Sequence, residues 1–87
     1  MTKLWEADYK GHKIRVENTW FNGELLYVDE ELQDQQVGIC ATRSRLFGRI
    51  KSGDGMGEKI KVSLGASWFS AICQIFIDDK LVLANKA

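Results

Sequence analysis

The sequence has few of the residues and segments on which many functional classes depend. Its 87 residues contain a single histidine, His12, and two cysteines, and two cysteines alone do not form a zinc site without histidines at ligand spacing. No apolar run approaches the ~20 residues that cross a bilayer. The first ten residues, MTKLWEADYK, are too polar for a signal peptide. We therefore expect a cytoplasmic protein with no membrane association, metal or other cofactor.

The two cysteines are expected to be structural. Cys40 and Cys73 both lie in predicted strands among apolar neighbours. In a reducing compartment cysteine behaves as a small hydrophobic residue, which favours buried thiols over a disulfide or a catalytic pair.

The chain also lacks an excess of either charge. Twelve basic and twelve acidic residues give a net charge of zero, which argues against a dedicated nucleic-acid binder. The distribution is uneven, because half of the basic residues lie between positions 43 and 61. Acidic residues collect instead at Asp29, Glu30, Glu31 and Asp34. A neutral protein with poles of opposite sign can associate with itself or with a polarised partner.

The segment 59–83 has the periodicity of a β-sheet. Ile60, Val62 and Leu64 alternate with polar residues, which places the apolar set on one face of a strand. A second run, 71–77, is rich in β-branched and aromatic residues and ends at two aspartates, after which alternation resumes. The segment therefore predicts three consecutive strands joined by turns.

The same pattern occurs earlier in the chain. KIRV at 13–16 matches KIKV at 59–62, Trp20-Phe21 matches Trp68-Phe69, and YVDEEL at 27–32 matches FIDDKL at 76–81. We interpret this as a pseudo-repeat of strand, Trp-Phe corner, strand, acidic turn and strand. One such meander would expose an apolar face, whereas two can cover each other.

The remaining segments predict further strands and connections. We expect strands at 4–9, 24–29, 37–42 and 45–51, a turn or bulge near 43–44, a polar loop at 33–36 and a hairpin loop at 52–58. The glycines of the 52–58 loop would supply positive φ angles. His12 follows Gly11 and is expected to be a solvated turn residue.

No arrangement of residues in the sequence indicates catalysis. The 52–58 loop lacks the lysine-hydroxyl pair of a phosphate-binding loop, and its two carboxylates are too few for calcium. No serine, cysteine or carboxylate lies at a recognised spacing from His12. The carboxylate pairs at 30–31 and 78–79 are explained by turn chemistry. We therefore do not expect an enzyme.

The runs HKIRVENTWFNGELLYVDEEL and EKIKVSLGASWFSAICQIFIDDKL resemble the pattern of the Fas apoptotic inhibitory molecule family. The resemblance covers most of the chain and includes an HKI-type entry and a YVDG-type turn, although Glu30 replaces the turn glycine. It implies a small all-β sandwich domain with a non-enzymatic interaction function.

We predict a single all-β domain over residues 1–87, an antiparallel β-sandwich of seven or eight strands built from two pseudo-symmetric meanders. A partly open β-barrel is the alternative. Trp5, Trp20 and Trp68 are expected to plug the ends of the core. The expected core residues are Ile14, Val16, Leu26, Val28, Ile39, Leu46, Ile50, Ile60, Val62, Leu64, Cys73, Ile75 and Ile77.

Two functions are compatible with this fold. The leading hypothesis is a non-catalytic module that binds a protein partner or another copy of itself through a basic face, with an acidic surface such as the 29–34 turn of another copy as its target. The alternative is binding of a small ligand or carbohydrate by the corner aromatics Trp20, Phe21, Trp68 and Phe69. The basic face consists of Arg45, Phe47, Arg49, Lys51, Lys59 and Lys61, which alternation places together on the outer side of one hairpin.

Overall fold

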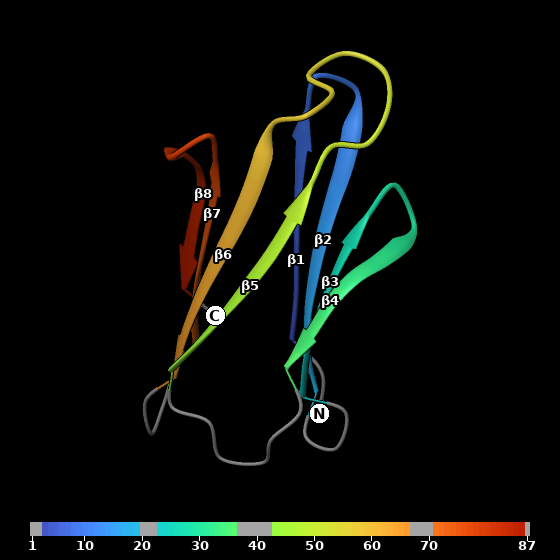
Figure 1. Cartoon of the computed structure of the whole chain (residues 1–87). Coiled ribbons are helices and arrows are strands. Elements are labelled where there is room, and N and C mark those ends of the chain that lie inside the picture. Colours follow the sequence, from blue (N-terminus) through green and yellow to red (C-terminus); the bar gives the residue numbers. More distant parts are fainter. Residues whose placement is uncertain (1–2, 20–22, 37–42, 67–70, 87) are drawn as a thin grey trace.

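The computed structural model describes residues 3–19, 23–36, 43–66 and 71–86, which form eight strands (Figure 1). The strands are β1 (Lys3–Tyr9), β2 (His12–Thr19), β3 (Gly23–Val28), β4 (Glu31–Gln36), β5 (Arg43–Arg49), β6 (Lys59–Ala66), β7 (Ala71–Ile77) and β8 (Lys80–Lys86). No helix long and apolar enough to cross a membrane occurs among these residues.

The strands form two four-stranded antiparallel sheets. The first has the order β1-β2-β3-β4 and the second the order β5-β6-β7-β8, so each sheet is one meander of sequential strands. The described strands do not close into one barrel, because β4 and β5 are not paired through their backbones. The predicted β-sandwich of two meanders is therefore confirmed.

The two sheets repeat each other at the level of backbone geometry. The β3–β4 turn has positive φ at Asp29 and Glu30, and the β7–β8 turn has positive φ at Asp78 and Asp79. In each copy the first aspartate accepts a hydrogen bond from a strand-entry amide, that of Lys13 or Lys59. The pairing register also shifts at matching positions, between residues 26 and 27 and between 75 and 76. Side-chain capping of this kind offsets the cost of left-handed backbone at residues other than glycine.

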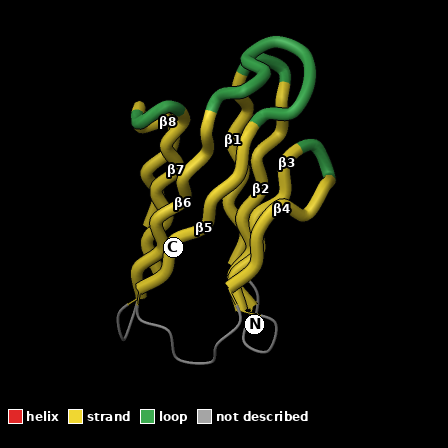
Figure 2. Tube along the Cα trace, in the orientation of Figure 1, coloured by secondary structure: helices red, strands yellow, loops and turns green. Residues whose placement is uncertain are grey.

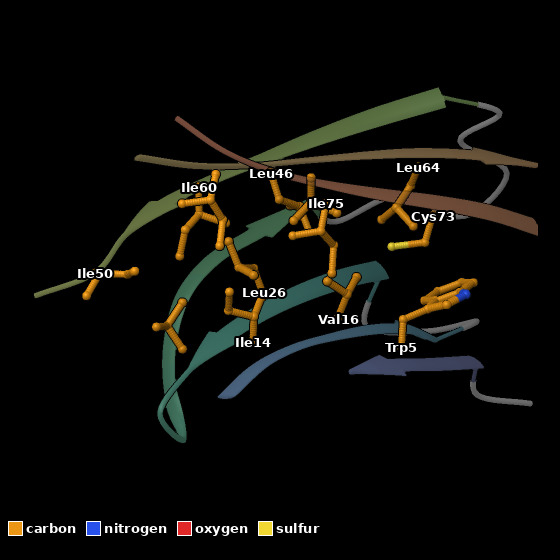
Figure 3. Packing of buried hydrophobic residues seen from close by; sticks show 13 residues of the cluster. Trp5, Ile14, Val16, Leu26, Leu46, Ile50, Ile60, Leu64, Cys73 and Ile75 are labelled. Carbon is orange, nitrogen blue, oxygen red and sulfur yellow. The ribbon is translucent and has the colours of Figure 1, made fainter. Parts of the chain in front are cut away.

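The core lies between the two sheets (Figure 3). Every predicted core residue within the described part of the chain is buried, and Trp5 packs at one end near Cys73. Ile39, Trp20 and Trp68 lie outside the described residues. Strand alternation explains this outcome, because one face of each strand must be apolar wherever two sheets cover each other.

Some predicted boundaries were wrong. Residues 33–36 form the second part of β4 rather than a loop, and residues 43–44 begin β5 without a break. The strand predicted at 45–51 ends at Arg49, so Ile50 and Lys51 belong to the following loop. The strand predicted at 37–42 lies outside the described residues. Residues 33–36 resemble a loop in the sequence because all four are polar. An edge strand such as β4 can be polar, because it does not need an apolar face.

Three turns and the long 50–58 loop lie at the same end of the molecule (Figure 2). The glycines at 53, 55 and 57 all have positive φ, as predicted. Three loop amides bind carbonyl groups in or beside the loop, those of Met56, Gly57 and Glu58. These amides are therefore not directed toward a bound anion.

Candidate functional site

The basic face lies on β5 and β6, at the outer surface of the second sheet. Leu46, Ile60 and Val62 point into the core, so the residues between them point outward. Arg45 pairs with Ser63, Phe47 with Lys61 and Arg49 with Lys59 across the two strands. The structure therefore brings five of the six predicted residues together on these two strands. The sixth, Lys51, lies in the loop that follows β5.

The two sheets differ strongly in charge. The strands of the second sheet contain seven basic residues and no acidic residue, whereas those of the first contain six acidic and three basic residues. In the second sheet the basic residues are Arg43, Arg45, Arg49, Lys59, Lys61, Lys80 and Lys86. In the first sheet the acidic residues are Glu6, Asp8, Glu17, Glu24, Glu31 and Asp34, and the basic residues are Lys3, Lys13 and Arg15. The net charge of zero hides this separation.

Three apolar side chains and one lysine form a row across the outer face of the second sheet. The register places Phe47, Lys61, Phe76 and Leu81 side by side on the four strands. Phe47 is 57% exposed and Leu81 is 53% exposed. The Lys61 ammonium lies 4.9 Å from the centroid of the Phe76 ring, an attractive cation–π arrangement. The outer surface therefore combines apolar contact area with positive charge.

A shallow pocket of about 290 Å³ opens beside Phe47. Its lining consists of Gln33, Phe47, Gly48, Arg49 and Lys51, so it extends from the basic face toward β4. Lys51 itself forms a 2.8 Å ion pair with Glu31, which partly neutralises this end of the pocket. The pocket is open to solvent and lacks the enclosed apolar walls of a typical small-molecule site.

Two side chains of β4 seal the outer edge of β5, a feature the sequence analysis missed. Gln33 accepts a hydrogen bond from the Arg49 amide and donates one to the Arg49 carbonyl. Asp34 accepts a 2.8 Å hydrogen bond from the Phe47 amide. Gln33 reaches β5 because it is the extra residue of the β-bulge in β4. We call Gln33 and Asp34 the edge latch.

The acidic cluster at 29–34 is already engaged within its own chain. Asp29 contacts His12 and the Lys13 amide, Glu30 pairs with Arg15, Glu31 pairs with Lys51, and Asp34 belongs to the edge latch. These contacts occupy the carboxylates that would have to reach another copy. The geometry therefore disfavours the 29–34 turn as the target of the basic face.

The two sheets also differ in whether their cations form ion pairs. In the first sheet Lys13 pairs with Glu6, and Arg15 pairs with Glu17 and Glu30. Among the ion pairs of the described residues, none involves Arg45, Arg49, Lys59 or Lys61. The basic face therefore presents positive charge that its own sheet does not neutralise.

His12 is buried, so the prediction of a solvated turn residue was wrong. Its side chain is covered by the 50–58 loop, a long-range contact that local sequence does not reveal. Nδ1 lies 2.6 Å from an Asp29 carboxylate oxygen and Nε2 lies 2.7 Å from the Asp54 carbonyl oxygen. Both partners are acceptors, so only the protonated imidazolium can donate to both.

These contacts shift the ionisation of the pair. The hydrogen bond to Asp29, and then that to the Asp54 carbonyl, raises the pKa of His12 above its ordinary value. The hydrogen bond from His12, and then that from the Lys13 amide, lowers the pKa of Asp29. With both ring nitrogens occupied, His12 joins the loop to the β3–β4 turn and has no free nitrogen to act as a base.

We expect the unfolding temperature to fall as pH rises from about 6 to 9. The folded state holds the His12 proton more tightly than the unfolded chain, so this contribution is complete below the unfolded pKa of about 6.5. It is lost as pH rises through the higher folded pKa. The Asp29 contribution is present above its unfolded pKa and is lost as pH falls through its lower folded pKa.

Thermal melts of wild type and His12→Gln across this range measure the effect. The variant has no titrating group at position 12, so its unfolding temperature should depend less on pH. Equal pH dependence of the two proteins would assign the effect to other groups.

Neither cysteine chemistry nor a metal site is found in the described part of the chain. Cys73 is buried and free, and burial raises the pKa of its thiol to about 12, so a thiolate does not form at neutral pH. No cluster of three or more metal-ligating side chains occurs among the described residues. Cys40 lies outside them.

The four corner aromatics also lie outside the described residues, as do all contacts they make. Ligand binding by Trp20, Phe21, Trp68 and Phe69 therefore stays a prediction. Comparison with protein-family models, curated proteins and solved structures finds no significant match to this chain. The resemblance to the Fas apoptotic inhibitory molecule family likewise stays a prediction.

Proposed function

We propose that the protein is a non-catalytic interaction module that binds an acidic surface of a partner protein through the basic face. One observation carries the proposal: the second sheet has no carboxylate in any strand, and no ion pair of the described residues involves Arg45, Arg49, Lys59 or Lys61. A surface with uncompensated charge of one sign attracts a partner of the opposite sign and speeds their encounter.

The apolar row supports a protein partner. Aromatic residues and arginine are enriched in protein interfaces, where a central apolar contact is surrounded by polar groups. Phe47 and Leu81 are half-exposed on the two edge strands of the sheet, and Arg45 and Arg49 flank Phe47 along β5. A purely electrostatic binder of phosphate groups does not need this apolar area.

The geometry favours a different protein over another copy of this chain. The acidic residues of the 29–34 turn are engaged within the molecule. On the outer face of the first sheet, carboxylates such as Glu6 and Glu17 lie beside cations of the same sheet. Apart from Asp8, the exposed carboxylates of these two surfaces are engaged within the chain, so they offer little of the unpaired negative charge that the basic face requires.

The test is affinity capture with a charge-reversed variant, Arg49→Glu with Lys61→Glu, followed by reconstitution of the purified pair. We expect the variant to bind the captured partner at least about tenfold more weakly, because repulsion replaces attraction at two positions. Binding by wild type should weaken as the Debye length falls from ~10 Å at about 0.1 M salt to ~3 Å at about 1 M.

The matched control is Lys3→Glu with Lys13→Glu, which makes the same change in net charge on the first sheet. This control should bind as wild type does. Equal binding by all three proteins would show that the basic face does not take part in the interaction. Equal losses in both variants would show that only total charge matters.

A further inference from the structure

The two edges at which the sheets approach each other are pseudo-equivalent in position but not in chemistry. At the first edge β4 lies beside β5, and at the second β8 lies beside β1. The register matches Gln33 to Val82 and Asp34 to Leu83, because each pair occupies the same place relative to the bulge. The edge latch is therefore replaced by two aliphatic side chains.

The side chains of Val82 and Leu83 cannot form hydrogen bonds with the backbone of a neighbouring strand. Both are half-buried against the core, and hydrocarbon side chains have no hydrogen-bonding group to offer β1. Among the described residues, no side chain hydrogen-bonds the backbone of Leu4, Glu6 or Asp8. The backbone at the outer edge of β1 thus lacks the side-chain hydrogen bonds that the edge latch makes to the backbone of β5.

The hairpin register shows which backbone groups this edge presents. Tyr9 and His12 flank the two-residue turn Lys10-Gly11, so they form a hydrogen-bonded pair, and alternate pairs along the strand do the same. The intervening residues Leu4, Glu6 and Asp8 direct both N–H and C=O away from β2. These are the counterparts of Arg45, Phe47 and Arg49, of which the latter two are bonded by the edge latch.

The side chains along this edge define the chemistry of an added strand. Glu6 and Asp8 are exposed on the outer face, where Arg15 lies opposite Glu6 and Lys13 lies opposite Asp8. Lys13 pairs with Glu6 at 3.8 Å and Arg15 pairs with Glu17 and Glu30, so no ion pair of the described residues involves Asp8. On the inner side Ala7 of β1, and Val82 and Leu83 of the neighbouring β8, are half-buried against the core. An added strand would need cationic side chains outward and apolar side chains inward.

We propose that the β1 edge is a β-augmentation site for an extended segment of a partner protein in which basic and apolar residues alternate. Three residues of β1 supply N–H donors and C=O acceptors for the added strand, as in other cases of strand addition. Opposite charges facing each other across neighbouring strands are stabilising. The site is separate from the basic face and does not depend on the function proposed for it.

Pairing of two β1 edges from separate copies is disfavoured by the same charges. In an antiparallel arrangement Glu6 or Asp8 of one copy would lie opposite or diagonal to Glu6 or Asp8 of the other. Like charges across a strand pair are destabilising, and charged edges protect native sheets from pairing with themselves.

The test uses a synthetic seven-residue peptide that alternates lysine and valine, titrated into isotope-labelled protein and followed by amide NMR shifts. We expect saturable shifts at Leu4, Glu6 and Asp8 and slower hydrogen exchange of their amides. A peptide with glutamate in place of lysine should bind this edge at least about tenfold more weakly.

Two variants separate backbone pairing from charge attraction. Glu6→Pro removes an outward N–H on an edge strand, where proline is tolerated, and should abolish binding while the protein stays folded. Glu6→Lys with Asp8→Lys keeps the backbone donors and should reverse the preference toward the glutamate peptide.

Several results would overturn the proposal. These are the absence of saturable binding, shifts confined to the second sheet, retained binding by a folded Glu6→Pro protein, or a homodimer that forms through β1 without peptide. If Glu6→Pro does not fold, a peptide N-methylated at alternate residues gives the same test, because it cannot donate to the β1 carbonyls.

Discussion

Truncation of Leu46 to alanine is expected to lower the free energy of unfolding by about 2–5 kcal/mol, the range for deletion of a buried aliphatic side chain. Leu46 is fully buried between the sheets, opposite Val62 on β6. In a domain of this size each kcal/mol lowers the unfolding temperature by roughly 4–8 °C. Denaturant titration at neutral pH measures the change directly.

The next residue along β5 is the matched control. Phe47 is 57% exposed on the outer face, so Phe47→Ala should change stability by no more than about 0.5 kcal/mol, as is usual for surface positions. The same variant should weaken partner binding, because Phe47 lies in the apolar row of the basic face. Comparable destabilisation by both changes would mean that Phe47 is not outward.

The second large effect is expected at Gly48, where β5 lies against Gln33 and Leu26 of the first sheet. A Cβ atom there would overlap Gln33 Oε1 of the edge latch and lie 3.1 Å from Leu26 Cδ2. We expect Gly48→Val to destabilise the protein by about 1–3 kcal/mol, the usual cost of overpacking. Thermal and denaturant unfolding of the purified variant give the value.

Two further variants isolate the cause. Gly65→Val on β6 is the control, because a Cβ there meets no heavy atom within 4 Å, and it should be nearly neutral. Gly48→Ala should cost less in a Gln33→Ala background than in wild type, since the overlapping oxygen is gone. Strict additivity of Gly48→Ala and Gln33→Ala would contradict close contact between these residues.

The alternation of residue types was sufficient to predict the sheets and their faces. Ile60, Val62 and Leu64 could be assigned to the core because a half-buried strand has a period of two. The same rule assigned Arg45 and Phe47 to the outer face. The repeat of KI-V and YVDE/FIDD segments then indicated two meanders, because each needs the other to cover its apolar face.

The features that the sequence did not predict depend on contacts between distant segments. The edge latch joins β4 to β5 through a bulge residue, and its glutamine and aspartate look locally like loop residues. His12 looks like a turn residue until the 50–58 loop covers it. Polar residues in strands carry no periodic apolar signal, so their roles follow only from the three-dimensional arrangement.

The basic face and the β1 edge could also be recognised only after the strands had been assigned to their sheets. The sequence showed a basic stretch at 43–61, but seven cations and no carboxylate in one sheet became evident only when the strands were assigned. The same assignment showed that Val82 and Leu83 stand where the latch residues stand in the other repeat. The two similar meanders thus allow a comparison within one chain.

The most direct measurement of binding by the basic face is an amide NMR titration with a synthetic peptide that alternates glutamate and valine. We predict saturable shifts at Arg45, Phe47, Arg49, Lys59 and Lys61 that disappear in about 1 M salt, where the Debye length is only ~3 Å. A single-stranded oligonucleotide titrated in parallel should bind more weakly. Shifts centred on β1–β4, or tighter binding of the oligonucleotide at the basic face, would contradict a module for acidic protein surfaces.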